Sequence, residues 1–188
     1  MTSKPEDRPS GFVAGINRLL VYFAGVAVGS AHSASEDWDV AGYSIVGIIV
    51  SAAAVEATVG EYLALPQNRS FFASDLEQWK QSMPRTHEII KSIVTKRSGK
   101  KVGDLAWYDR MRCLFELRNK VVHYYPEFRL AGTFPAELEA CISKKAIHPG
   151  GDDSMDWTSR LLVPAVAGQA ALIAQQAIDG FLDEARAK

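Results

Sequence analysis

Two long segments without charged residues constrain the fold most. Residues 19–35 contain no Asp, Glu, Lys or Arg, and residues 40–55 contain none either. Both segments are shorter than the roughly 20 apolar residues that a helix needs to cross a bilayer. Small and polar residues dilute both, and Arg18 and Glu56 bound them. We therefore interpret them as buried core helices, with a membrane-embedded hairpin as the alternative.

The rest of the composition agrees with one globular domain. The chain has 188 residues, of which 47% are hydrophobic and 23% are charged, enough to bury a sizeable core. Residues 1–10 contain prolines and acids and lack the features of a signal peptide, so we expect a flexible tail before a single domain over 11–188. The net charge of -1 attracts neither nucleic acid nor membranes globally. Any such contact must use a local patch.

The two cysteines, Cys113 and Cys141, are too far apart in the sequence for a zinc ribbon or a CxxC redox motif. A domain of this length does not need a disulfide for stability. A reducing cytoplasm is therefore the simplest location.

Helical signals follow one another along the chain, and strand signals are scarce. This order predicts an all-α fold, an up-and-down antiparallel bundle of about five helices. Residues 126–155 form an irregular insert. The expected helices cover about 11–31, 42–65, 74–97 with a break at Pro84, 105–124, a short 136–145, and 156–185 with a kink or restart at Pro164.

Three sequence signals mark the expected helix ends. Ser74 followed by Glu77 resembles a capping box, in which the two side chains satisfy free backbone N–H groups. Asp104 is a good N-cap for the helix over 105–124. Pro126 ends that helix, because the residue before a proline avoids α geometry.

The helix over 105–124 places an arginine on its apolar side. At about 100° per residue, Arg118 lies in the middle of the stripe that faces the core. A guanidinium there is costly unless it is paired, so it needs a carboxylate, a phosphate or an interface. Glu56, the first acid after the uncharged run, is the candidate for a purely structural ion pair. The stripe comprises Trp107, Met111, Leu114, Val121 and Tyr125.

A second face of this helix is polar. Arg112, Glu116, Asn119 and His123 follow one another at helical spacing, and Arg112 can pair with Glu116. His123 and Arg118 lie about 140° apart on an ideal helix. They converge only if the helix distorts, if the arginine side chain wraps round, or if a second subunit supplies one of them. A helix-end histidine that meets carbonyls and the helix dipole is the alternative for His123.

These residues resemble a family signature. Proteins of the HEPN family are all-helical and carry an Arg, four to six residues and then a His near the end of a late helix, often with Asn after the Arg. Arg118, Asn119 and His123 match the four-residue form, and the Ala-rich segment before Glu56 is similar to the second helix of HEPN domains. The resemblance covers residues 42–126 and the last helix.

The match extends to the HepT toxins, which are the HEPN partners of minimal nucleotidyltransferase antitoxins. His123, Tyr124 and Tyr125 complete the pattern Arg-x4-His-x-Tyr that resembles theirs. In HepT-like systems the antitoxin attaches AMP to this tyrosine, so Tyr125 is a candidate modification site, with core packing as its alternative role. The insert over 126–155 has no counterpart in these toxins.

The resemblance implies a metal-independent endoribonuclease that needs no cofactor, in the role of a toxin or phage-defence effector. In such enzymes the 2′-hydroxyl of RNA attacks the adjacent phosphate and leaves a 2′,3′-cyclic phosphate. His123 would carry the proton, Arg118 would neutralise the phosphorane, and Asn119 would orient one of them. Two protomers share such a site, which implies a homodimer. The supporting or binding residues are Glu56, Arg112, Glu116 and Lys120.

RNA binding would use a basic run over residues 91–101, which contains no acid. The alternative is an ordinary solvated helix end. A catalytically inactive HEPN-like module that binds RNA, a nucleotide or a partner protein is the alternative function. The RNA-contact candidates in the run are Lys96, Arg97, Lys100 and Lys101.

Overall fold

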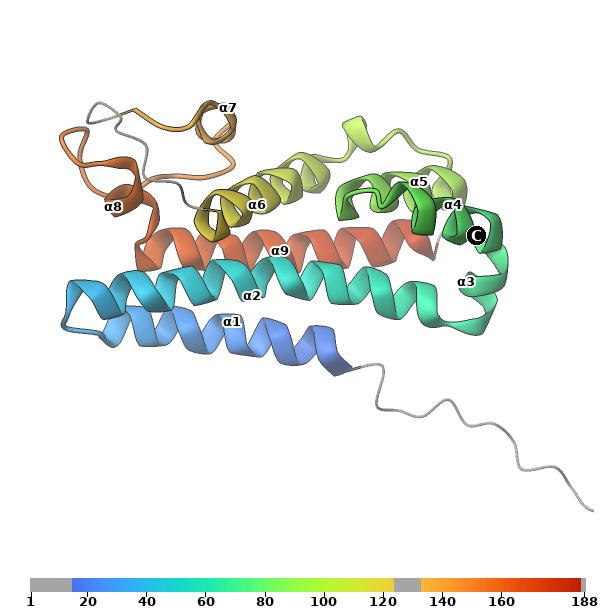
Figure 1. Ribbon diagram of the computed structural model, residues 1–188, viewed down its shortest axis with the longest axis horizontal. Coiled ribbons are helices and arrows are strands. Elements are labelled where there is room, and N and C mark those ends of the chain that lie inside the picture. Colours follow the sequence, from blue (N-terminus) through green and yellow to red (C-terminus); the bar gives the residue numbers. More distant parts are fainter. Residues whose placement is uncertain (1–14, 124–132, 187–188) are drawn as a thin grey trace, which may run out of the picture.

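The computed structural model describes residues 15–123 and 133–186, and it confirms the all-α class (Figure 1). No strand occurs among these residues. The helices are α1 (Ile16–Ser33), α2 (Asp37–Ala64), α3 (Pro66–Phe71), α4 (Ala73–Ser82), α5 (Thr86–Ser98), the 3-10 helix η2 (Val102–Asp104), α6 (Ala106–Val122), α7 (Ala136–Ser143), α8 (Trp157–Leu161) and α9 (Pro164–Ala185).

The long helices α2 and α9 form the centre of the molecule. They pack against each other along their length, and α1 packs on both of them. Figure 1 shows α5 and α6 on the side of this pair that lies away from α1. Helix α6 contacts both α2 and α9, and α7 packs on α6. The central pair therefore fixes the position of α6, which carries the Arg118 motif.

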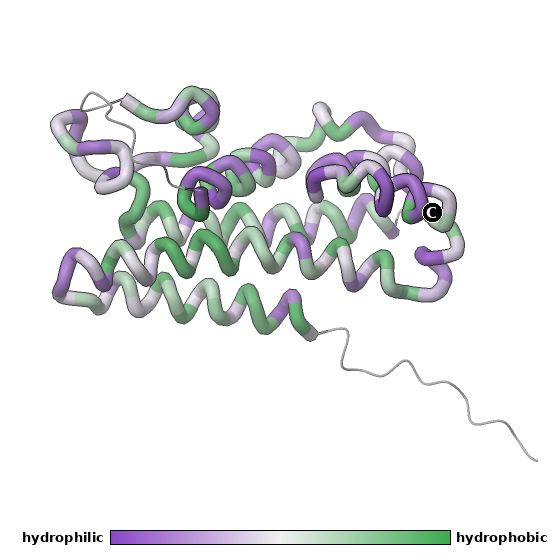
Figure 2. Tube along the Cα trace, in the orientation of Figure 1, coloured by the Kyte–Doolittle hydropathy of each residue, from purple (hydrophilic) through white to green (hydrophobic). Residues whose placement is uncertain are grey.

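Small residues allow α2 and α9 to approach closely. A Cβ atom added to Gly47 would lie 3.3 Å from the Cβ of Ala167, so the glycine sits directly against α9. Ala52 and Ala170, at 0% and 1% exposed, belong to the same buried cluster. Figure 2 shows the apolar residues gathered on α1, α2 and α9. The uncharged segment 40–55 thus lies in the central pair. The interpretation of residues 19–35 as a buried core helix was wrong, because α1 packs on one side only and buries just Ala24, Ala27 and Ala31.

Helix α2 is also long and apolar enough to cross a membrane, judged by length and composition alone. Its most apolar stretch is 39% buried inside the protein, where it packs on α1 and α9. The core interpretation of residues 40–55 accounts for the buried part of this helix. A large exposed part remains.

Several helix boundaries differ from the sequence prediction. Helix α2 begins at Asp37, so the connection to α1 covers only residues 34–36 instead of 32–41. The acids at this position sit in the first turn of α2, where the helix dipole favours negative charge. Helix α2 ends at Ala64, and a further short helix, α3, follows it directly. Pro66 is the first residue of α3, a position that suits proline.

Two of the predicted caps were wrong. Ser74 lies inside α4, whose N-cap is Phe72, so the Ser74–Glu77 pair does not cap this helix. Asp104 belongs to the 3-10 helix η2, and Leu105 is the N-cap of α6. The predicted restart of the last helix at Pro164 is confirmed, since α9 begins there after the separate helix α8.

The structure contains a disulfide between Cys113 of α6 and Cys141 of α7, which the sequence interpretation did not expect. Both residues are buried, and their Cα atoms lie 5.5 Å apart. Phe134 and Leu138 are buried in the same cluster, so α7 packs its apolar side on α6. Packing of the insert brings the two cysteines together, and this tertiary contact leaves no trace in their spacing.

We expect Gly180→Ala to destabilise the fold by about 1–3 kcal/mol, the usual range for overpacking. A Cβ atom at Gly180 would lie 2.5 to 2.8 Å from three atoms of the Trp107 indole ring. Either α9 or the indole must move. Thermal unfolding of the variant measures the effect. The control is Gly25→Ala on α1, where a Cβ meets nothing within 4 Å; it should be neutral or stabilising.

Asp156 caps α8 by accepting hydrogen bonds from four donors, the backbone N–H and the hydroxyl of both Thr158 and Ser159. Its carboxylate accepts hydrogen bonds from the backbone N–H of Thr158 at 2.9 Å and of Ser159 at 3.1 Å, and from the Ser159 hydroxyl at 2.6 Å. The side-chain hydrogen bonds from Ser159 and Thr158 lower the pKa of Asp156 from 3.8 to about 2. The cap therefore stabilises the fold fully above pH 4 and is lost as the pH falls toward 2.

We expect Asp156→Ala to cost about 1 kcal/mol at neutral pH, the usual value for an N-cap. The difference from wild type should shrink between pH 4 and pH 2, because the wild-type carboxyl becomes protonated there. Urea unfolding at several pH values measures this. Asp156→Asn, which keeps a capping oxygen without a titrating group, should have a smaller penalty at neutral pH, and its difference from wild type should fall by the same amount as the pH falls. A pH-independent penalty for Asp156→Ala would contradict the assignment.

Candidate functional site

Arg118 forms an ion pair with Glu56. The Arg118 Nη2 atom lies 2.5 Å from Glu56 Oε1, and this contact joins α6 to α2. Arg118 lies on the core-facing side of α6, and there it meets a carboxylate, as one of the sequence alternatives required. The pair is not sealed. The Arg118 side chain is 26% exposed and the Glu56 side chain is 40% exposed.

Two further residues hold the pair. The Thr86 hydroxyl, at the start of α5, lies 3.4 Å from Glu56 Oε1 and donates to it. The Arg118 guanidinium lies 5.8 Å from the centre of the Phe115 ring, within the range of a cation–π contact. Residues of α2, α5 and α6 thus hold one guanidinium group whose side chain remains partly exposed to solvent.

His123 lies at the C-cap of α6. Its backbone N–H donates to the carbonyl of Asn119 at 2.9 Å, and its φ and ψ of -105° and 44° leave the helical region. The residue is exposed. Tyr125 and the rest of residues 124–132 lie outside the described residues.

The structure brings Arg118 and His123 to the same end of α6 but not into contact. No hydrogen bond or ion pair joins their side chains within the described residues. The helix is regular through Val122, so their angular separation persists along most of the motif. A phosphate that touches both groups must therefore bridge two sides of the helix end, or the second group must come from another protomer.

The polar row on α6 is largely solvent-facing. Arg112 is exposed, Glu116 and Asn119 are partly exposed, and no ion pair between Arg112 and Glu116 forms in the described part of the chain. Lys120 instead pairs with Glu137 of α7 at 3.1 Å. Of the supporting residues, Glu56 pairs with Arg118, and Lys120 joins α6 to α7. Arg112 and Glu116 lie at the surface of α6.

His87 of α5 joins this row, and sequence reasoning missed it. Burial lowers the pKa of His87 below its usual 6.5; nearby Glu88 and Glu116 act against this, and Arg112 acts with it. Its backbone carbonyl accepts a hydrogen bond from the Tyr108 hydroxyl at 3.0 Å. The Tyr108–His87 hydrogen bond joins α5 to α6 there, and no pattern within α5 predicts this position.

Most of the basic run already has intramolecular partners. Lys96 lies 2.6 Å from both carboxylate oxygens of Asp75, and Lys100 lies 2.7 Å from Glu184 Oε1. Arg97 donates to Asn68 at 2.7 Å and lies 4.0 Å from the centre of the Phe71 ring. Lys101 is exposed. The run therefore presents less free positive charge than its sequence suggests.

Comparisons with known proteins add no relative. No protein-family model matches the chain, and neither the curated proteins nor the solved structures contain a match. Among residues 15–123 and 133–186, no group of three or more His, Cys, Asp or Glu side chains could hold a metal ion. The HEPN resemblance therefore stays an interpretation of the α6 motif and its surroundings.

Proposed function

We propose that the protein is a metal-independent endoribonuclease of the HEPN type, with its site at the C-terminal end of α6. The observation that carries the proposal is the Arg118 guanidinium. Glu56, which also accepts a hydrogen bond from Thr86, orients it, its side chain is 26% exposed, and the exposed His123 lies at the same helix end. An arginine held in this way can donate hydrogen bonds to a phosphate oxygen without a large rearrangement.

The chemistry needs only groups of these types. His123 removes the proton from a ribose 2′-hydroxyl, and the 2′-oxygen attacks the adjacent phosphorus. The bond to the 5′-oxygen breaks, and that oxygen takes a proton from an acid. Arg118 neutralises the negative charge on the crowded phosphorane, and Asn119 orients the phosphate or the imidazole. The products are a 2′,3′-cyclic phosphate and a free 5′-hydroxyl.

A homodimer would remove the need for one helix to bring together Arg118 and His123, which lie about 140° apart around α6. If two copies contribute to one cleft, the base comes from one protomer and the acid from the other, and no single helix has to bring Arg118 and His123 together. The proposal includes an up-and-down HEPN-like bundle, a role as a toxin or defence effector in the cytoplasm, and a nucleotidyltransferase antitoxin as partner. Tyr125 is the candidate site for its AMP modification.

One observation favours a second function. Glu56 already satisfies the Arg118 guanidinium, as it would if the arginine were purely structural. In that case the protein is a catalytically inactive helical module that binds RNA, a nucleotide or a partner protein. The two functions differ in whether His123 matters for RNA breakdown.

The test is incubation of the purified protein with a mixed pool of cellular RNA in the presence of EDTA. We expect wild type to cleave RNA and His123→Ala to lose about 10²–10⁴-fold of that activity, the usual contribution of a general acid or base. His148→Ala is the matched control, because His148 is exposed but lies near α9, where its backbone N–H meets Gln169. Equal cleavage by both variants and wild type would contradict the role of His123.

A further inference from the structure

A broad apolar surface covers the outer side of α1 and α2, which we call the α1–α2 face. Its large side chains are between 43% and 65% exposed. Single exposed apolar residues are common on soluble proteins, but a contiguous patch of this kind marks an interaction site. The face comprises Ile16, Leu19, Tyr22, Phe23 and Val26 of α1, and Tyr43 and Val46 of α2.

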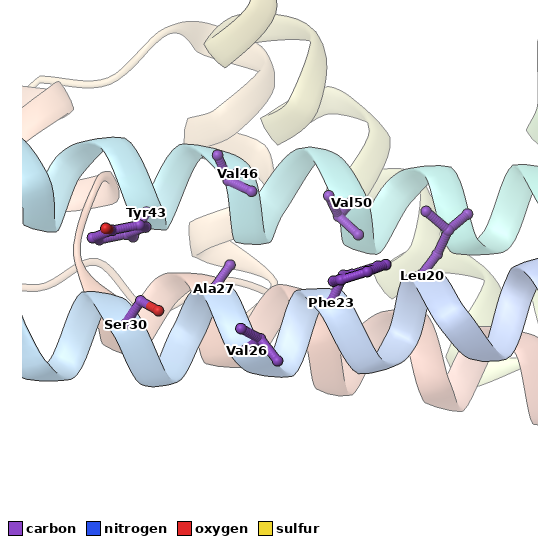
Figure 3. Close-up of a pocket in the computed structure, with 8 residues that line it drawn as sticks. All are labelled: Leu20, Phe23, Val26, Ala27, Ser30, Tyr43, Val46 and Val50. Carbon is purple, nitrogen blue, oxygen red and sulfur yellow. The ribbon is translucent and has the colours of Figure 1, made fainter.

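A shallow groove runs through the middle of this face. Five residues of α1 and three of α2 line it, and Figure 3 shows Phe23 and Val50 on its two sides. The hydroxyl groups of Ser30 and Tyr43 are the polar side-chain groups in this lining. No charged side chain belongs to it. Such a groove accepts ridges of apolar side chains from other helices.

The area of the face matches what a stable dimer needs. Seven large side chains, each about half exposed, offer roughly 800 Å² of surface, given that aromatic side chains alone bury about 150–250 Å² each. A standard protein interface buries about 800 Å² on each partner. The face is also an antiparallel pair of helices, so two copies related by a two-fold axis can close into a four-helix arrangement.

The charges around the face argue against a lipid surface. Helices that lie on membranes carry Lys and Arg beside their apolar side. Here α2 contains no Lys or Arg, and α1 contains only Arg18. The connection between the helices carries Glu36, and the first turn of α2 carries Asp37 and Asp39. Anionic lipid headgroups would repel this turn. A protein surface with the same apolar character has no such conflict.

We infer that the α1–α2 face binds a second copy of this chain. The inference names the surface for the homodimer that the proposed function uses, but it stands without any nuclease activity. The outer side of α2 continues from Val46 through the partly exposed Ala53 and Ala57 toward the partly exposed Glu56, which follow one another at helical spacing. The dimer interface therefore borders the Arg118–Glu56 pair, and the second copy limits access to it.

The test is sedimentation equilibrium of the full chain across a range of concentrations, without RNA. We expect wild type to be a dimer at micromolar concentration. Val46→Asp should raise the dissociation constant at least about 100-fold, because dimer formation would bury an unpaired charge. Leu172→Asp is the matched control: Leu172 is 58% exposed but lies on α9 outside the face. This variant should remain dimeric.

Circular dichroism and thermal unfolding verify that both variants fold, and Phe23→Asp on α1 provides a second test of the face. A wild type that stays monomeric at 100 micromolar would overturn the inference, and so would dimers that Val46→Asp and Phe23→Asp leave intact. A monomer that floats with vesicles of neutral phospholipid would assign the face to a membrane instead. RNA cleavage by a monomer would separate failure of this inference from failure of the proposed function.

Discussion

Arg118→Ala is expected to reduce RNA cleavage by about 10²–10³-fold, the usual loss when one group that stabilises developing negative charge is removed. The reason is that no other described cation occupies the same place: the neighbouring Lys120 is tied to Glu137. Arg118→Lys should recover little of the rate, because an ammonium cannot match the planar fork that faces phosphate. Initial rates of cleavage, measured in EDTA, give the comparison.

The fold should survive this substitution. Glu56 loses its partner, but its side chain is 40% exposed and can be hydrated, so the loss of stability stays small. Arg110→Ala is the matched control, since Arg110 is an exposed arginine of the same helix that contacts Gln176 of α9. An equal loss of cleavage in both variants would point to a general charge effect. Full activity in Arg118→Ala would remove the arginine from the mechanism.

Reduction of the Cys113–Cys141 disulfide is expected to destabilise the protein by about 3.5 kcal/mol, which follows from the loop entropy for a separation of 28 residues. For a chain of this size, that corresponds to a fall in the melting temperature of about 7–14 °C. Differential scanning calorimetry with and without a dithiol reductant measures it. A reducing cytoplasm contains such reductants, so the melting temperature of the protein without the disulfide applies there.

The double variant Cys113→Ala and Cys141→Ala is the control for this experiment. It should melt near the temperature of the reduced wild type, and the reductant should not change it. The Lys120–Glu137 pair and the buried Leu138 still join the insert to α6 after reduction, so residues 133–147 should remain packed. A wild-type melting temperature that the reductant leaves unchanged would contradict a disulfide between the two residues.

The sequence predicted the fold class and most helices, because apolar periodicity and proline act locally. Pro164 restarts the last helix, and the short helix in the insert occurs at Ala136–Ser143, close to the predicted 136–145. The caps failed because several residues compete for each helix end, and tertiary packing selects among them. Ser74 lies inside α4 for this reason. Asp104 does not cap α6, whereas another aspartate, Asp156, caps α8.

The candidate site was predictable only in part. Helical spacing placed Arg118 on the apolar side of its helix. Glu56 was its candidate partner as the first acid after the uncharged run, and the structure contains this ion pair. The position of His87 beside the polar row, the partners of Lys96 and Lys100, and the disulfide all depend on contacts between helices distant in sequence. No spacing within one helix encodes such contacts.

The most direct test of the central claim is the chemical nature of the RNA ends that the wild-type protein leaves in EDTA. Mass spectrometry of the products after limited cleavage identifies them. The account predicts 2′,3′-cyclic phosphate at one end and a 5′-hydroxyl at the other, because the nucleophile is the ribose itself and no metal-bound water takes part. Products with a 3′-hydroxyl and a 5′-phosphate, or no products from any RNA pool, would contradict it.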